Sequence, residues 1–123
     1  MTESAGVSRG EKVSAYVTKD GSTIRELMHP DHTIAKQQSL AEATVAPGEI
    51  TEAHYHQVTE EFYFILEGQG IMMLGDEHFA VGPGDTVCIR PGIRHHIRND
   101  GDINLKFLCC CSPAYSHDDT YLL

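Results

Sequence analysis

From residue 39 onward, short runs of apolar and β-forming residues alternate with turn-forming residues. The runs are SLAEATV, APGEIT, FYFIL, GIMML, HFAV, TVCI, HHIRN and NLKFLCCC, and turn residues such as Gly-Asp at 75–76 and Gly-Pro-Gly-Asp at 82–85 lie between them. One strand and turn about every ten residues is typical of an antiparallel sandwich or barrel. No long segment has a convincing helical period, although residues 22–27 could form a turn of helix. The pattern predicts an all-β fold.

The length of the chain favours one closed β domain. A small antiparallel protein has to protect its sheet edges, and a double-sheet jelly roll does so. The chain has 123 residues, of which 41% are hydrophobic, enough for a single core. Residues 1–20 show no sustained period, so we expect them to form a flexible N-terminal arm. Residues 21–123 are then one antiparallel β-barrel, with a C-terminal tail from about residue 112.

The charge balance points to small-molecule partners. Nine Lys and Arg residues against eighteen Asp and Glu residues give a net charge of −9. Such a chain is repelled by phosphate, so we expect neither nucleic-acid nor membrane binding. No apolar run approaches the length of a membrane helix, and the first twenty residues lack the apolar stretch of a secretory signal. A cytoplasmic location is therefore expected.

The four cysteines do not suggest a disulfide framework. Cys88 stands alone, Cys109, Cys110 and Cys111 are consecutive, and no Cys-x-x-Cys pair occurs. On a strand, Cys109 and Cys111 would point to one face and Cys110 to the other. We interpret them as small buried hydrophobic residues, with metal binding or thiol chemistry as the alternative.

Three histidines and a glutamate stand out as candidate metal ligands. His54 and His56 are separated by one residue, so both imidazoles project from the same face of an extended strand. Glu61 and Tyr63 share a face of the next strand, and His95 follows the turn at 90–92. Nitrogen and oxygen donors of this kind suit a divalent transition metal and leave coordination positions for water, substrate or dioxygen. Taken alone, a His-x-His pair is more often a solvated or hydrogen-bonded strand pair.

At these residues the sequence resembles the cupin superfamily. The first cupin motif, Gly-x5-His-x-His-x(3,4)-Glu-x6-Gly, is matched without gaps by Gly48, His54, His56, Glu61 and Gly68. Five identities at fixed spacing make this match specific. The resemblance covers roughly residues 39–111 and is to small single-domain bacterial cupins.

The second cupin motif, Gly-x5-Pro-x-Gly-x2-His-x3-Asn, is matched with one departure. Gly84, Gly92, His95 and Asn99 are present, but Arg90 stands where the motif has its first Pro. Pro91, the next residue, supplies the same restriction of φ. The position of Asn99 assigns the motif histidine to His95, and His96 is sent to the opposite face by the strand period.

The resemblance implies a metal centre and a range of functions. By it, His54, His56, Glu61 and His95 bind one divalent transition metal ion, with Fe, Mn, Zn, Ni and Cu not distinguished, and the protein forms homodimers. Some cupins keep the barrel only as a scaffold. The leading hypothesis is a dioxygenase-type oxidoreductase. The alternatives are a non-redox sugar or sugar-acid isomerase, epimerase or lyase, and a non-catalytic small-molecule-binding protein.

The residues also suggest features of the substrate and its pocket. One carboxylate beside a divalent ion leaves a formal charge of +1, which favours small, oxygen-rich, anionic substrates. Tyr63 should face the interior and is the candidate catalytic residue, with core packing as the alternative.

Two further polar groups are candidates for contacts at the rim. We interpret Arg90, Arg94 and Arg98 mainly as a solvated face, with a carboxylate or phosphate clamp as the alternative. The C-terminal tail has four polar residues that would form a lid over the mouth of the barrel if it folds there. They are Tyr115, His117, Asp118 and Asp119.

Overall fold

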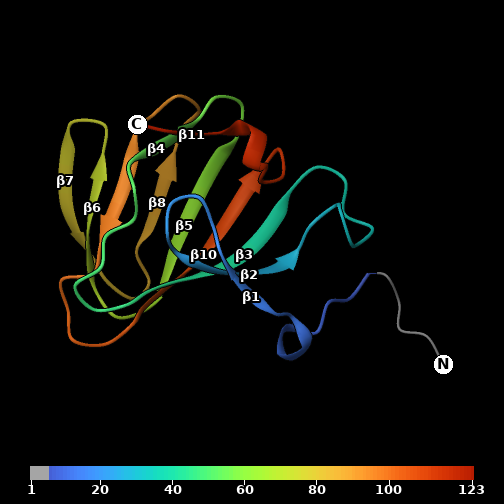
Figure 1. Cartoon of the computed structure of the whole chain (residues 1–123), viewed down its shortest axis with the longest axis horizontal. Coiled ribbons are helices and arrows are strands. Elements are labelled where there is room, and N and C mark those ends of the chain that lie inside the picture. The colour runs from blue at the N-terminus through green and yellow to red at the C-terminus, as the bar shows by residue number, and fades with distance from the viewer. Residues whose placement is uncertain (1–5) are drawn as a thin grey trace.

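The computed structural model describes residues 6–123, and β-strands account for almost all of their regular structure (Figure 1). The strands are β1 (Ala15–Val17), β2 (Thr23–Met28), β3 (Ser39–Val45), β4 (His54–His56), β5 (Glu60–Glu67), β6 (Gly70–Leu74), β7 (Glu77–Val81), β8 (Thr86–Ile89), β9 (His95–Arg98), β10 (Leu105–Ser112) and β11 (Thr120–Leu122). The helices among these residues are two short 3-10 turns, η1 (Gly10–Lys12) and η2 (His117–Asp119). No helix within residues 6–123 is long and apolar enough to cross a membrane.

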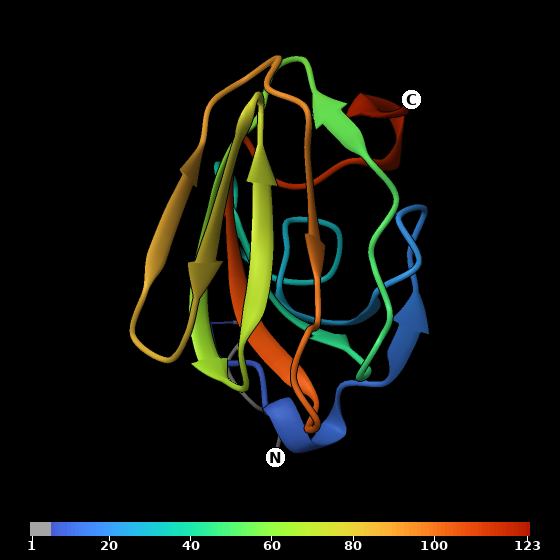
Figure 2. The same ribbon diagram turned by 90° about the vertical axis from the view of Figure 1, so that its left-hand side faces the viewer.

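The strands form two antiparallel sheets that face each other (Figures 1 and 2). One sheet has the order β1-β2-β3-β10-β5-β8 and the other β11-β4-β9-β6-β7. Strands that are neighbours in a sheet are therefore often far apart in sequence, as for β3 and β10. This is the predicted all-β double-stranded jelly roll, and the prediction is confirmed.

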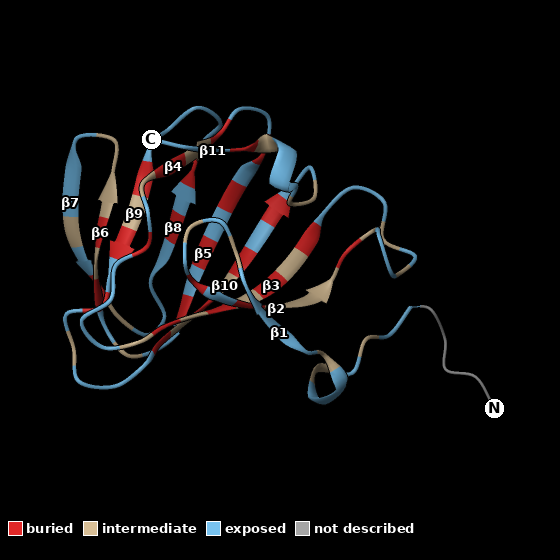
Figure 3. Ribbon diagram, in the orientation of Figure 1, coloured by how far each residue is buried: buried red, intermediate tan, exposed pale blue. Residues whose placement is uncertain are grey.

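Alternate residues of the strands point into the space between the sheets. Bands of buried and exposed residues follow one another along β5 and β10 (Figure 3). The core contains large side chains that are fully buried, among them Ile65, Met72, Ile97, Leu105 and Phe107. Burying a side chain of this size stabilises the fold by about 1.5–3 kcal/mol. The same alternation sends Glu61 and Tyr63 inward between the core residues of β5.

Two local expectations differ from the structure. Residues 22–27 do not form a turn of helix but lie largely in β2, where Ile24 is buried and pairs with Ala43 of β3. Pairing with a neighbouring strand outweighs a short stretch of helical propensity. The segment 46–51 is not a strand either. It contains a turn with Gly48 at φ +81°, and it contacts β9 through an isolated bridge between Ile50 and Arg98 and through hydrogen bonds between Thr51 and Ile97.

The sheet begins inside the segment expected to be an N-terminal arm. β1 pairs with β2, and the ammonium group of Lys19 donates hydrogen bonds to the carbonyl oxygens of His117 and Thr120 at 2.7 and 3.1 Å. The paired region therefore starts at residue 15 rather than at residue 21. Residues 1–5 of the expected arm lie outside the described residues, and its flexibility stays a prediction.

Candidate metal centre

Three imidazoles meet between β4 and β9. His54 and His56 point inward from β4, and His95 lies directly opposite His54 in the antiparallel register of the two strands. All three are buried, and one ring nitrogen of each lies within 4.8 Å of the others. Residues separated by about forty positions are thus brought together by one pair of strands.

Each of these imidazoles is oriented by a hydrogen bond on its outer nitrogen. Nδ1 of His54 lies 2.8 Å from the carbonyl oxygen of Glu52. Nδ1 of His56 lies 3.2 Å from the carbonyl oxygen of Asp119, and Nδ1 of His95 lies 3.0 Å from that of Ile93. A carbonyl oxygen only accepts, so Nδ1 carries the proton and donates it. Nε2 of each ring then presents a lone pair toward the other two, the orientation that a metal-binding histidine needs.

Glu61 lies beside two of the three imidazoles. Its Oε1 is 3.3 Å from Nε2 of His56 and 3.7 Å from Nε2 of His95, while its Oε2 accepts a hydrogen bond from the thiol of Cys111 at 3.3 Å. Burial disfavours the charged form of Glu61, but contact with His56 and His95 outweighs it and lowers the pKa of the carboxyl group. The carboxylate of Glu61 therefore faces two of the three imidazoles, those of His56 and His95.

The histidines respond differently to burial. Burial and the neighbouring His54 lower the pKa of His95 to about 4, which keeps this ring neutral at physiological pH. Burial also opposes protonation of His56, but the contacts of this ring with Glu61 and Asp119 together outweigh burial and raise the pKa of His56. The neutral form is the one that binds a metal.

Two buried polar atoms at this point have no hydrogen-bond partner within the described chain. They are Oε1 of Glu61 and Nε2 of His95, which face each other. Buried polar atoms are nearly always paired, so two acceptors aimed at one point indicate a place for a cation. The donor set of three imidazoles and a carboxylate also suits a divalent transition metal. The three buried histidines could bind a metal ion.

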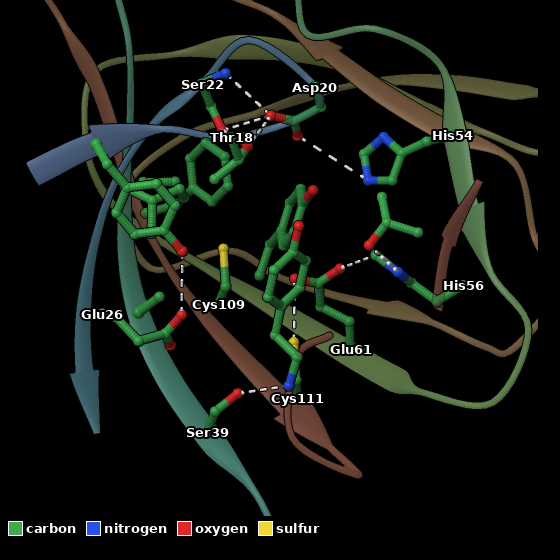
Figure 4. A pocket seen from close by; sticks show the side chains of 18 residues that line it. Thr18, Asp20, Ser22, Glu26, Ser39, His54, His56, Glu61, Cys109 and Cys111 are labelled. Atoms are coloured by element: carbon green, nitrogen blue, oxygen red, sulfur yellow. Dashed lines mark hydrogen bonds and ion pairs between the residues drawn. The ribbon is translucent and has the colours of Figure 1, made fainter. Parts of the chain in front are cut away.

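A cavity adjoins His54, His56 and Glu61, and His95 is not among the residues that line it (Figure 4). Tyr63 and Tyr115 line it, and burial raises the pKa of Tyr63 well above its usual value and that of Tyr115 to about 12. Both hydroxyls therefore stay protonated. Tyr63 faces the interior as expected and packs against Phe107, with ring centroids 4.4 Å apart.

The arginine candidates and the competing histidine lie outside this cavity. Arg90, Arg94 and Arg98 are exposed and none of them lines it, which agrees with a solvated face. Arg94 lies 3.9 Å from the exposed carboxylate of Asp76. His96 is half-buried and follows His95 in β9, and it also does not line the cavity.

The C-terminal tail forms part of the barrel wall instead of a lid. β11 pairs with β4, so that Thr120 lies opposite His56. The carboxylate of Asp119 accepts hydrogen bonds from the backbone N–H groups of residues 57–59 at 3.0 to 3.2 Å. Together with the bond from His56 to the carbonyl of Asp119, these contacts fix the end of β4. The tail thus supports the histidine pair.

Sequence reasoning missed Asp20 and the position of Cys111. Asp20 lines the cavity from the turn between β1 and β2, inside the segment expected to be an arm. The pair Asp20-Gly21 indicates a turn in the sequence, but it does not indicate that this turn lies at the cavity. Cys109 and Cys111 are buried and Cys110 is exposed, as the strand alternation predicts. Cys111, however, contacts Glu61 rather than only filling space.

Comparison with known proteins agrees with the fold and the motif. A family model described as a cupin domain matches residues 41–111. An uncharacterized protein of Methanocaldococcus jannaschii is 51% identical over 113 residues, which are 92% of this chain and 90% of the relative. The chain therefore belongs to the cupin family, as a small single-domain member.

Solved structures support the same architecture. The polyketide cyclase RemF from Streptomyces resistomycificus has a TM-score of 0.79 at 23% identity, over 94% of this chain and 82% of that one. Pac13, described as a nucleoside dehydratase, has a TM-score of 0.77 at 17% identity, over 94% of this chain and 88% of that one. At these identities the similarity concerns the fold.

Proposed function

We propose that this cupin is a metal-dependent enzyme that binds one divalent transition metal ion through His54, His56, His95 and Glu61. Convergence of three buried, oriented imidazole nitrogens, with two unpaired acceptor atoms among the four side chains, carries this proposal. A bound ion would polarise an oxygen of a small substrate or lower the pKa of water. The adjoining cavity, which is lined by His54, His56 and Glu61, offers the substrate a place beside the ion.

Proton transfer without net oxidation is the reaction class that the cavity favours. Its lining contains Asp20, Glu26, Glu61, Tyr63 and Tyr115, which are groups that accept or hold protons. The two structurally similar proteins named above are called a cyclase and a dehydratase, and neither reaction requires an oxidant. An isomerase or lyase on a hydroxylated substrate fits these groups, with Tyr63 holding a proton at its hydroxyl.

A dioxygenase is the second candidate. Three imidazoles and one carboxylate would leave coordination positions on the cavity side, where dioxygen and a chelating substrate could both bind. A dioxygenase-type oxidoreductase is also the leading hypothesis from the sequence. Oxygen consumption separates the two candidates, since only the oxidative reaction requires dioxygen.

The charges of the cavity favour a substrate with hydroxyl groups over an anion. A divalent ion with Glu61 as its one carboxylate ligand has a formal charge of +1, and the carboxyl groups of Asp20 and Glu26 offset this charge. Burial raises the pKa of Glu26, so Asp20 is the stronger of these two contributions. Among the described residues, no Lys or Arg lines this cavity. We therefore replace the expected anionic substrate with a neutral, oxygen-rich one.

Protein purified without added metal is expected to contain about one divalent ion per chain, measured by elemental analysis.

Incubation with sugars, hydroxy ketones, phenols and hydroxy acids, followed by NMR of the products, is expected to yield conversion without oxygen uptake at an electrode. Stoichiometric oxygen uptake would favour the dioxygenase. Recovery of every bound compound unchanged would make the protein a binding module, and absence of metal after reconstitution would contradict the proposal.

We also propose that the protein forms a homodimer through the outer face of β5. This face presents three exposed apolar side chains, Phe62 (44% exposed), Phe64 (40%) and Leu66 (38%). In the neighbouring strand β10, Cys110 pairs with Phe62 and Leu108 pairs with Phe64. A contiguous exposed apolar area of this kind is typical of an interface.

Light scattering during gel filtration is expected to give twice the monomer mass for the wild type and the monomer mass for Phe64→Glu. Ile34→Glu, at another exposed apolar residue (65% exposed), is the control and should remain dimeric. A monomeric wild type would contradict this assembly.

A further inference from the structure

Asp20 points from the β1–β2 turn into the cavity, toward His54 (Figure 4). Its side chain is only 13% exposed. Oδ1 accepts hydrogen bonds from the hydroxyl of Thr18 at 2.8 Å and from the backbone N–H and hydroxyl of Ser22 at 2.9 and 2.6 Å. Three donors on one oxygen hold the carboxylate in a single orientation, which directs the other oxygen at the imidazole.

The second oxygen of Asp20 faces a group that also accepts. Oδ2 lies 3.9 Å from Nε2 of His54, which presents a lone pair because Nδ1 donates to the carbonyl of Glu52. Two acceptors that face each other in a largely buried site are unfavourable unless a cation or a hydrogen-bond donor lies between them. The separation is too long for a direct hydrogen bond and leaves room for a group that contacts both.

Asp20 and Glu61 approach the imidazoles from different sides (Figure 4). Glu61 contacts His56 and His95, whereas Asp20 contacts His54. Neither carboxylate belongs to the group of three nitrogen atoms that lie within 4.8 Å of one another, and Asp20 lines the cavity wall on the side of His54. A molecule bound in the cavity next to His54 therefore lies beside this carboxylate.

We propose that Asp20 is a specificity-determining residue that selects hydroxyl-bearing ligands at the metal centre. Its Oδ2 accepts a hydrogen bond from the hydroxyl of a ligand bound on the cavity side, and its charge repels anions that have no donor. The class selected is that of alcohols, enols and phenols. This inference rests on the proposed metal centre and adds a residue that the cupin motifs do not contain.

The test uses the Co²⁺-loaded protein and two probes that differ in one donor. Glycolate and methoxyacetate are both monoanionic carboxylates, but only glycolate has a hydroxyl group. Binding of each is followed through the visible spectrum of the cobalt ion, as is binding of azide, an anion without a donor. Asp20→Asn keeps an oxygen that can accept from Thr18 and Ser22, so the turn is preserved while the charge is removed.

In Asp20→Asn, the preference for glycolate over methoxyacetate is expected to fall about tenfold, which is the scale of one hydrogen bond to a charged group. Azide is expected to bind several-fold more tightly because the repelling charge is gone. Ser22→Ala, which removes one of the donors that orient Asp20, should lower the preference by a smaller factor. Asp85→Asn is the matched control, since Asp85 also accepts from a turn N–H, that of Gly82, but lies outside the cavity.

Two negative results have different meanings. If the wild type and Asp20→Asn bind Co²⁺ and show the same probe preferences, the role of Asp20 is overturned and the metal centre stands. If the wild type does not bind Co²⁺ at all, the proposed function fails and this inference falls with it.

Discussion

Replacing His56 by Ala is expected to abolish metal binding while the fold persists. The substitution removes one of three converging nitrogen donors, and a site that loses a ligand binds its ion much more weakly. We expect the metal content to fall from about one ion per chain to below about a tenth. The fold should persist because His56 projects into the cavity and its strand is held by β11 and by the carboxylate of Asp119. Elemental analysis and far-UV circular dichroism measure the two effects.

His96→Ala is the matched control for this experiment. His96 is a half-buried histidine next to His95 that is not among the three histidines whose ring nitrogens converge, so its removal should leave the metal content unchanged. Added metal should raise the melting temperature of the wild type and of His96→Ala, because an ion at a hundred times its Kd stabilises the folded state by about 2.7 kcal/mol. The same addition should leave His56→Ala unchanged. Full metal content in His56→Ala would show that the ligand assignment is wrong.

The strands were predictable where period-two alternation and turn residues coincide. Residues 39–45, 70–74 and 86–89 are strands with the bounds that the pattern gives, because each is followed within three residues by Gly or Pro and the last two are also preceded by Gly. The histidine pair of β4 and the glutamate of β5 were also visible, since their spacing within one short segment already places them on inward faces. Their approach to His95 required a strand pairing that only the family motif suggested.

Residues that reach the site through distant pairings were not predictable. Tyr115 and Asp119 come to β4 because β11 joins the edge of the five-stranded sheet, and nothing in the tail itself specifies that partner. Asp20 enters the cavity because β1 and β2 extend the other sheet. The first event depends on a pairing across about 60 residues and the second brings Asp20 to His54 across about 30, and local propensity carries no information on either contact.

The substrate charge shows how this limits functional inference. Counting the predicted ligands alone gives a positive centre and an anionic substrate. Asp20 and Glu26 add carboxyl groups from β2 and the turn before it, and they change the electrostatic balance without touching either cupin motif. Ligand motifs therefore carry no information on charged residues that reach the cavity from other parts of the chain.

Gly68→Ala is expected to destabilise the fold far more than Gly48→Ala, although both glycines belong to the same motif. Both have a positive φ, +79° and +81° respectively, which costs an Ala residue about 1–2 kcal/mol. At Gly48 an added Cβ would meet nothing within 4 Å, so the backbone conformation is the whole cost. At Gly68 the Cβ would lie 2.6 Å from the carbonyl oxygen of Asn104 and 3.0 Å from Cα of Leu105.

The clash at Gly68 involves backbone atoms, which cannot rotate away as a side chain can. Leu105 begins β10, the strand that pairs with both β3 and β5, so relief of the clash would displace the middle of the six-stranded sheet. We expect Gly68→Ala to lose about 4 kcal/mol or more of unfolding free energy, against about 1–2 kcal/mol for Gly48→Ala. Urea denaturation of the two variants measures the difference. Equal losses would mean that both motif glycines serve only backbone conformation, and that the close approach of β10 to the turn after β5 is not what requires Gly68.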